Sequence, residues 1–289
     1  MKTRSIQNRS KSNYVNMGPI RLRQPLPSFS INNVDPFILL HHYGPYEINS
    51  KSNPFDLGPH PHRGFEPITF LIQGEQLHRD SLGNESIVKS GDVQWTTAGK
   101  GIIHAEGPEK KFVERGGFLE GIQLWLNLPG SHKMMEPAYQ HVKDEDFKVV
   151  CSEDEKTSLK IIAGDYKGVL GKIKTQTEVN VIWAKSMEEA VEFIEVPKSH
   201  DALVYLIKGS LFVNELEYLG EDGDRMFTLN QDGEGLSIKA IVNSEYLILS
   251  GIPLKEKVVS HGPFVMNSSK EIQQAIYDYQ NGKMGYLAE

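Results

Sequence analysis

Two short pairs of metal-binding residue types stand out in the sequence. One proline separates His60 from His62, and one alanine separates His104 from Glu106. Side chains along a β-strand alternate between its faces, so in extended chain each pair points to one side. If neighbouring strands carry the two pairs, three imidazoles and a carboxylate converge on one ion. This donor set suits iron, manganese, nickel, copper or zinc, whereas calcium and magnesium prefer oxygen ligands alone.

The segments that would position these pairs are short, apolar and separated by turn residues. Before the midpoint they cover residues 68–72, 77–81, 86–89, 93–97, 101–105 and 118–128. After it they cover 147–151, 159–164, 177–185, 191–196, 202–207, 210–213, 225–229, 236–240 and 246–250. Evenly spaced short strands indicate an all-β barrel or sandwich. The strand-rich block occurs twice, which predicts two related β-domains in tandem.

One helix is expected after the second block. Ser268 and Glu271 have the spacing of a capping box, and Asn281-Gly282 supplies a stop signal. Apolar residues recur at helical spacing between these signals, at Ile272, Ala275, Ile276 and Tyr279. The pattern predicts an amphipathic helix that packs its apolar side on a barrel.

Composition excludes several classes of function. The formal net charge is −7 and the pI is about 5.8, so the chain as a whole repels nucleic-acid phosphates. Cys151 is the single cysteine, which excludes an internal disulfide and a cysteine-rich zinc site, and we expect it to be a small buried hydrophobe. The sequence shows neither a secretory leader nor a membrane-spanning stretch, and we expect a cytoplasmic protein.

Three segments carry a resemblance to a known family. They are residues 60–66 (HPHRGFE), 91–106 (GDVQWTTAGKGIIHAE) and 262–267 (GPFVMN), and they resemble the signature segments of the pirins, a branch of the cupins. The likeness extends from Asp35-Pro36-Phe37 to the expected helix. It implies a bicupin fold: a metal-binding cupin barrel over residues 1–130, a linker at 131–146, a second cupin barrel without metal at 147–265, and a short C-terminal helix and tail at 266–289.

The resemblance also implies a ligand set, namely iron held by His60, His62, His104 and Glu106. This is the set that strand alternation selects, with Fe(II) as the expected ion and other transition metals as alternatives. The general cupin pattern would instead name Glu66 as a ligand. Because pirins take their carboxylate from the second motif, Glu66 is expected to orient a histidine or to serve as a structural acid.

Pirins further resemble quercetin 2,3-dioxygenases, which implies an oxidoreductase that opens a flat, flavonol-like substrate with dioxygen. Glu106 would then be both a metal ligand and the catalytic proton acceptor. The alternative is an iron-dependent redox-sensing regulator that acts through a protein partner, as eukaryotic pirins are described. We expect a monomer with no direct nucleic-acid or membrane partner, since a bicupin already pairs two barrels.

Other residues are weaker candidates for the same site. His42 and His78 would either contact substrate or orient ligands, and Phe65 and Trp95 would either wall a flat pocket or belong to the core. In the second half His200 is the best counterpart of the first motif. A lone histidine is more often structural than ligating, so no metal is expected there.

Overall fold

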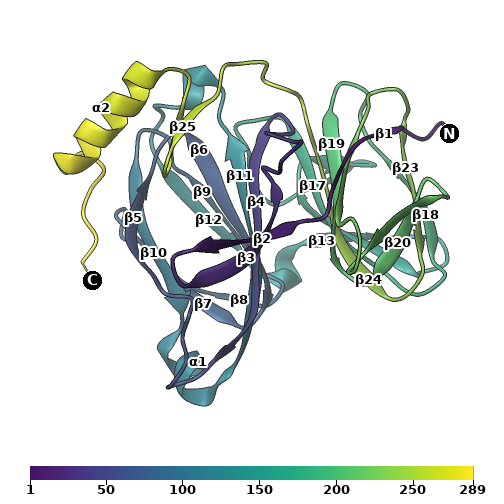
Figure 1. Cartoon of the computed structure of the whole chain (residues 1–289), viewed down its shortest axis with the longest axis horizontal. Coiled ribbons are helices and arrows are strands. Elements are labelled where there is room, and N and C mark those ends of the chain that lie inside the picture. Colours follow the sequence, from purple (N-terminus) through teal and green to yellow (C-terminus); the bar gives the residue numbers. More distant parts are fainter. Residues whose placement is uncertain (289) are drawn as a thin grey trace. The chain divides into compact units, whose positions relative to one another are not determined.

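The computed structural model describes residues 1–288, and its regular structure is mostly β-strand (Figure 1). The chain forms two compact units that exchange segments. We call the unit made of Tyr14–Arg23, Leu39–Glu145 and Lys255–Glu289 the first barrel. The unit made of Met1–Asn13, Gln24–Ile38 and Asp146–Leu254 is the second barrel.

The first barrel consists of a seven-stranded and a four-stranded antiparallel sheet. The larger sheet has the order β12-β9-β6-β11-β4-β3-β2. Its strands are β2 (Asn13–Met17), β3 (Ile20–Leu26), β4 (Phe37–Ile48), β6 (Phe65–Gln73), β9 (Val93–Thr97), β11 (Gly117–Asn127) and β12 (Ala138–Val142). The smaller sheet has the order β5-β10-β7-β8, with β5 (Leu57–His62), β7 (Glu75–Asp80), β8 (Glu85–Lys89) and β10 (Ile102–Pro108).

The second barrel repeats this plan. Its seven-stranded sheet has the order β1-β22-β19-β24-β17-β14-β13. The strands are β1 (Ile6–Ser10), β13 (Lys148–Cys151), β14 (Thr157–Ala163), β17 (Val179–Ser186), β19 (Asp201–Lys208), β22 (Met226–Leu229) and β24 (Ser244–Gly251). The four-stranded sheet has the order β18-β23-β20-β21, with β18 (Val191–Glu195), β20 (Ser210–Val213), β21 (Glu217–Gly220) and β23 (Gly235–Ala240). The same neighbour order in both smaller sheets confirms the predicted all-β duplication.

Smaller elements complete the two units. Two hairpins add β15 (Asp165–Tyr166) with β16 (Val169–Leu170), and β25 (Val259–His261) with β26 (Phe264–Met266). The helical elements are α1 (Lys110–Arg115), α2 (Ser269–Gln280) and the 3-10 turns η1 (Gly130–His132) and η2 (Asp144–Asp146). No described helix has the length and apolarity required to cross a bilayer.

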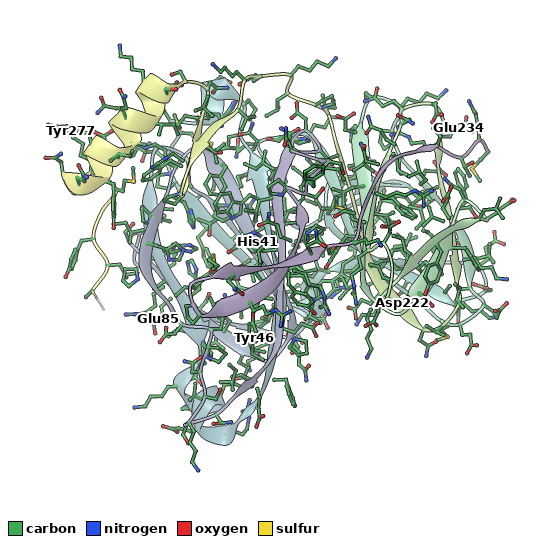
Figure 2. The ribbon with its side chains drawn as sticks, in the orientation of Figure 1. His41, Tyr46, Glu85, Asp222, Glu234 and Tyr277 are labelled. Atoms are coloured by element: carbon green, nitrogen blue, oxygen red, sulfur yellow. The ribbon has the colours of Figure 1, made fainter. Side chains whose placement is uncertain are left out.

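Helix α2 follows its predicted capping. The Ser268 side chain accepts a hydrogen bond from the backbone N–H of Glu271, and Asn281 is the C-cap residue. Ile272 and Ala275 belong to a buried cluster with Ile103 of β10 and Phe264 of β26, whereas Tyr277 is 57% exposed and points away from the strands (Figure 2). The helix therefore packs its apolar side on the strand that carries His104.

The structure differs from expectation in three places. Residues 1–13 group with the second barrel because β1 pairs with β22, although the expected boundary assigned 1–130 to the first barrel. The expected linker contains β12, which pairs with β9 along its whole length. Cys151 is exposed, so the expectation of a buried residue was wrong; it is the last residue of β13, at the edge of its sheet.

Candidate metal centre

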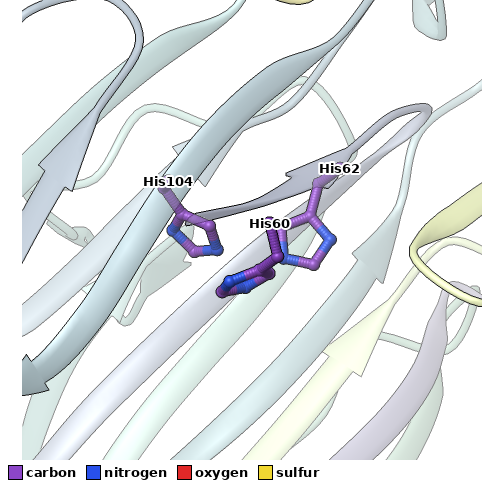
Figure 3. A group of neighbouring side chains, drawn as sticks. All are labelled: His60, His62 and His104. Atoms are coloured by element: carbon purple, nitrogen blue, oxygen red, sulfur yellow. The ribbon is translucent and has the colours of Figure 1, made fainter. Parts of the chain in front are cut away.

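The smaller sheet of the first barrel brings the predicted metal-binding pairs together. Strand β10 lies between β5 and β7, and His104 is directly opposite His60 in the β5–β10 register. Ring centroids are 4.4 Å apart for His60 and His104 and 4.8 Å apart for His62 and His104. The three side chains point toward one another from these two strands (Figure 3).

Two overlapping groups of potential ligands result. His60, His62 and His104 each offer a nitrogen, and these atoms lie within 4.8 Å of one another. Glu106 belongs to a second group of the same spacing, with His104 and His78. Across the strands Glu106 is opposite His78. The four predicted ligands are therefore divided between two overlapping groups, which share His104.

A tight turn holds the His-x-His segment in place. Gly64, between β5 and β6, has a φ of 86°, and a Cβ there would collide with the carbonyl oxygen of Val265. Next to His62, Arg63 donates from Nη1 to Asp278 of α2 at 2.9 Å and from Nε to the carbonyl of Lys100. The ligand strand is thus fixed by the glycine turn and by a buried ion pair to the helix.

The chemistry of the donor set fits a metal ion. Both ring nitrogens of His62 and of His104 are buried and lack hydrogen-bond partners among the described residues. Burial, with a smaller contribution from the neighbouring imidazole of His60, lowers the pKa of both rings well below the usual value, so both are neutral at pH 7. Neutral imidazoles with free lone pairs are what a transition metal requires.

Hydrogen bonds orient two further members of the cluster. His60 donates from Nδ1 to the carbonyl of Gly58 at 2.8 Å, which leaves Nε2 with the lone pair. Glu106 is 2% exposed and accepts hydrogen bonds from the Gln94 amide and, at 3.4 Å, from Thr69. The carboxylate therefore has hydrogen-bond partners within the barrel.

A cavity of about 480 Å³ opens beside the histidines. His60 and His62 are part of its wall, and the aromatic residues Tyr43, Phe55 and Trp125 are others. Tyr43 and Phe55 stack with ring centroids 4.4 Å apart. The cavity suits a flat, largely apolar molecule that reaches the histidines with one edge.

The two neighbouring histidines of β4 have different surroundings. On β4, His41 lines the cavity, while His42 lies 2.9 Å from Glu120 and takes no part in the lining (Figure 2 labels His41). Sequence reasoning singled out His42 and missed His41, because alternation along a strand does not reveal which face is the inner one. Burial lowers the pKa of His41 to about 4.

The aromatic residues that line the cavity differ from the expected pair, Phe65 and Trp95. Phe65 contacts His62 at a centroid distance of 5.2 Å and packs on Trp125, which lines the cavity. Trp95 is fully buried and lies outside the lining. The half-buried indole of Trp125 is thus a site residue that the sequence did not reveal.

Glu66 lies apart from the cluster. It alternates with Phe65 along β6, and Phe65 faces His62. The Glu66 carboxyl accepts a hydrogen bond from Thr97 at 2.6 Å, and burial raises its pKa to about 7. Among the described residues its carboxyl has no hydrogen bond to a histidine of the cluster, which favours a structural role for this acid.

Comparisons with known proteins agree with this architecture. Residues 20–126 match the pirin model and residues 182–285 match the pirin C-terminal cupin domain. A Pseudomonas aeruginosa protein whose provisional name is quercetin 2,3-dioxygenase is 38% identical, with 87% of each chain covered. The crystal structure of a quercetin 2,3-dioxygenase from Acinetobacter baumannii superimposes with a TM-score of 0.91 at 34% identity, over 99% of this chain and 100% of that one.

A more distant structure supports the assignment of the fold only. The bacterial pirin YhhW from Escherichia coli, solved with nickel(II), has a TM-score of 0.66 at 19% identity and covers 86% of this chain and 100% of that one. The two matching domain models, the 38% identity over most of both chains and the paired barrels give one conclusion. This chain belongs to the pirin family and is a bicupin.

Proposed function

We propose that the protein is a metal-dependent dioxygenase that opens a flavonol-like ring, with His60, His62, His104 and Glu106 as the ligands of one iron ion. The observation that carries the proposal is the position of His60 and His62, which belong both to the histidine cluster and to the cavity wall. An ion held there is within reach of a bound molecule.

The residues that line the cavity have separate roles in the proposed reaction. Tyr43, Phe55 and Trp125 bind the flat substrate and exclude water from it. His41 is neutral at pH 7 and offers the substrate a hydrogen-bonding imidazole. A bound divalent iron supplies the Lewis acidity and the one-electron chemistry that a reaction with dioxygen requires.

Glu106 is the proposed proton acceptor for the substrate hydroxyl. Its carboxylate does not line the cavity and accepts hydrogen bonds from Gln94 and Thr69. Both hydrogen bonds are accepted by Oε1, so Oε2 is the oxygen proposed to take the proton. A Glu106→Gln variant, which keeps the size of the side chain and removes its basicity, should therefore lose activity even where it still binds substrate.

The test is oxygen uptake, with detection of carbon monoxide, when iron-loaded protein is given quercetin. We expect turnover by the wild type and by His132→Ala, a control histidine whose side chain pairs with Ser131 and lies outside both ligand groups. His62→Ala should be inactive. Stoichiometric iron binding without oxygen consumption by the wild type would overturn the dioxygenase assignment for this class of substrate.

A further inference from the structure

Strand β7 carries a pair of residues that the proposed function does not use. His78 and Asp80 are two positions apart, and β7 is hydrogen-bonded to β10 on the side opposite β5. In the β7–β10 register Glu106 is opposite His78 and His104 is opposite Asp80. The second pair thus reaches His104 from the other side of the central strand.

The contacts of His78 fix both its ring plane and its tautomer. Its Nε2 lies 3.2 Å from the Asp80 carboxylate, so Nε2 carries the proton. Asp80 is held in turn by the backbone N–H of Leu82 at 2.9 Å and that of Asn84 at 3.0 Å. The ring of Tyr139 stacks on His78 with centroids 4.2 Å apart and planes 8° apart. A carboxylate behind a histidine is the arrangement that commonly orients a metal ligand.

The other ring nitrogen of His78 has no hydrogen-bond partner among the described residues. Nδ1 is buried in a side chain that is 0% exposed, and no hydrogen-bond partner reaches it. A purely structural histidine would use both nitrogens, because an unpaired buried polar atom costs about 1–3 kcal/mol. Ligand atoms of His78, His104 and Glu106 lie within 4.8 Å of one another. Such a group of two nitrogens and one oxygen suits a borderline divalent transition metal.

We propose that His78, His104 and Glu106 form a second, inner position for a divalent transition metal. His104 belongs to both groups, and Glu106 is also a ligand of the outer position in the proposed function. The neutral imidazole of His104 offers one lone pair. The two positions are therefore alternatives for a single ion. His60 and His62 line the cavity, whereas the three inner residues do not. An ion in the inner position is bound only by residues that do not line the cavity, which makes this a resting position for the metal.

The inference concerns metal binding alone and stands whether or not the oxygenase reaction is found. Its test removes the outer position with His60→Ala/His62→Ala and leaves the inner three residues intact. Purified apo-protein is titrated with Co(II), which reports its ligands by absorption, and with Zn(II) in competition with a chelator. We expect the double variant to bind one equivalent of metal, more weakly than the wild type and with a changed cobalt spectrum.

Adding His78→Phe to the double variant should lower the remaining affinity by at least about 100-fold, because a direct ligand is lost. Phenylalanine keeps a flat ring against Tyr139 and has no lone pair. The matched control adds His132→Ala to the same double variant and should leave the affinity unchanged. Circular dichroism melts identify any variant that fails to fold, and His78→Gln, which keeps a polar side chain, is used in its place if His78→Phe does so.

Two results would overturn the inner position. One is a folded double variant that binds no metal at millimolar concentration. The other is equal affinity with and without His78. Two equivalents of cobalt in the wild type would contradict the alternation between positions that the single lone pair of His104 requires.

Discussion

The two barrels have the same strand plan and opposite interiors. In β10 of the first barrel, His104 pairs with His60 on one side and with Asp80 on the other. In β23 of the second, Ile238 pairs in the same manner with Glu192 and Val213. Ile238 belongs to a core cluster of aliphatic and aromatic side chains that also contains Leu236 and Ala240. One scaffold therefore accommodates either a ligand cluster or a packed hydrocarbon core.

The difference shows what the cluster costs the first barrel. Burial of each inward apolar side chain of its smaller sheet stabilises the second barrel. The first buries imidazoles without partners, each of which opposes folding by about 1–3 kcal/mol until something binds it. His200 of the second barrel bonds Ser250 at its Nδ1, as a structural histidine does. Metal binding is thus expected to stabilise the first barrel selectively.

The largest effect is expected when an apolar residue replaces a ligand of the first barrel, as in the second barrel. His104→Ile removes the ligand shared by both groups, and we expect the affinity for Zn(II) to fall at least about 1000-fold because both positions lose a donor. The apo-protein should become more stable by about 1–2 kcal/mol, since two unpaired nitrogens disappear. Chelator competition and urea unfolding measure the two effects. Unchanged metal affinity would break the comparison.

The reciprocal change places a histidine in the apolar interior. Ile238→His should lower the free energy of unfolding by about 3 kcal/mol, because the new imidazole is buried without a partner or a second ligand. Metal should not restore the loss. Urea unfolding with and without Zn(II) measures this, and metal-dependent recovery would show that the second barrel also holds ligands.

A third test concerns the middle strands of the larger sheets. Strand β6 carries the buried Glu66, whereas the corresponding strand β19 has no charged side chain from Ala202 to Ile207. Because burial raises the folded pKa of Glu66 to about 7 from its ordinary value of 4.5, the folded state keeps a proton that the unfolded chain releases. This contribution to stability is fully present below pH 4.5 and is lost as the pH rises to about 7.

The loss amounts to roughly 3 kcal/mol between those pH values. Glu66→Gln should remove it and flatten the curve of unfolding free energy against pH, measured by urea unfolding of apo-protein from pH 4.5 to 7.5. Glu85→Gln, on the exposed part of β8, is the control and should follow the wild type. Parallel curves for wild type and Glu66→Gln would show that this acid is ionised in the fold.

The smallest expected effect concerns the ion pair behind the ligands. Buried arginines of the second barrel bond mainly to carbonyls, as Arg4 does with His200 and Pro197. In the first barrel Arg63 instead pairs with Asp278. Asp278→Asn should weaken metal binding by about tenfold, because the strand beside His62 loses its anchor. Glu271→Gln, at the exposed start of α2, is the control, and equal affinity in both variants would exclude the anchoring role.

Strand alternation was sufficient to predict which side chains of the cluster share a face. His60 with His62, and His104 with Glu106, follow from spacing alone. The same spacing occurs at His78 and Asp80, so that signal was present, yet only the pairing of β7 with β10 reveals its use. Strand register depends on contacts between distant segments, which a single sequence does not encode in any short pattern. For the same reason the exchange of residues 1–13 into the second barrel could not be predicted.

The exchange of segments has a consequence for biogenesis. Residues 39–145 hold every proposed ligand, but Gly262 and Pro263 of the cavity wall and Asp278 behind Arg63 lie in residues 255–289. A ribosome delivers that last segment only after the whole second barrel has been translated. The ligand strands therefore emerge long before their supports. We therefore expect the proposed metal site to be complete only after the whole chain has been translated.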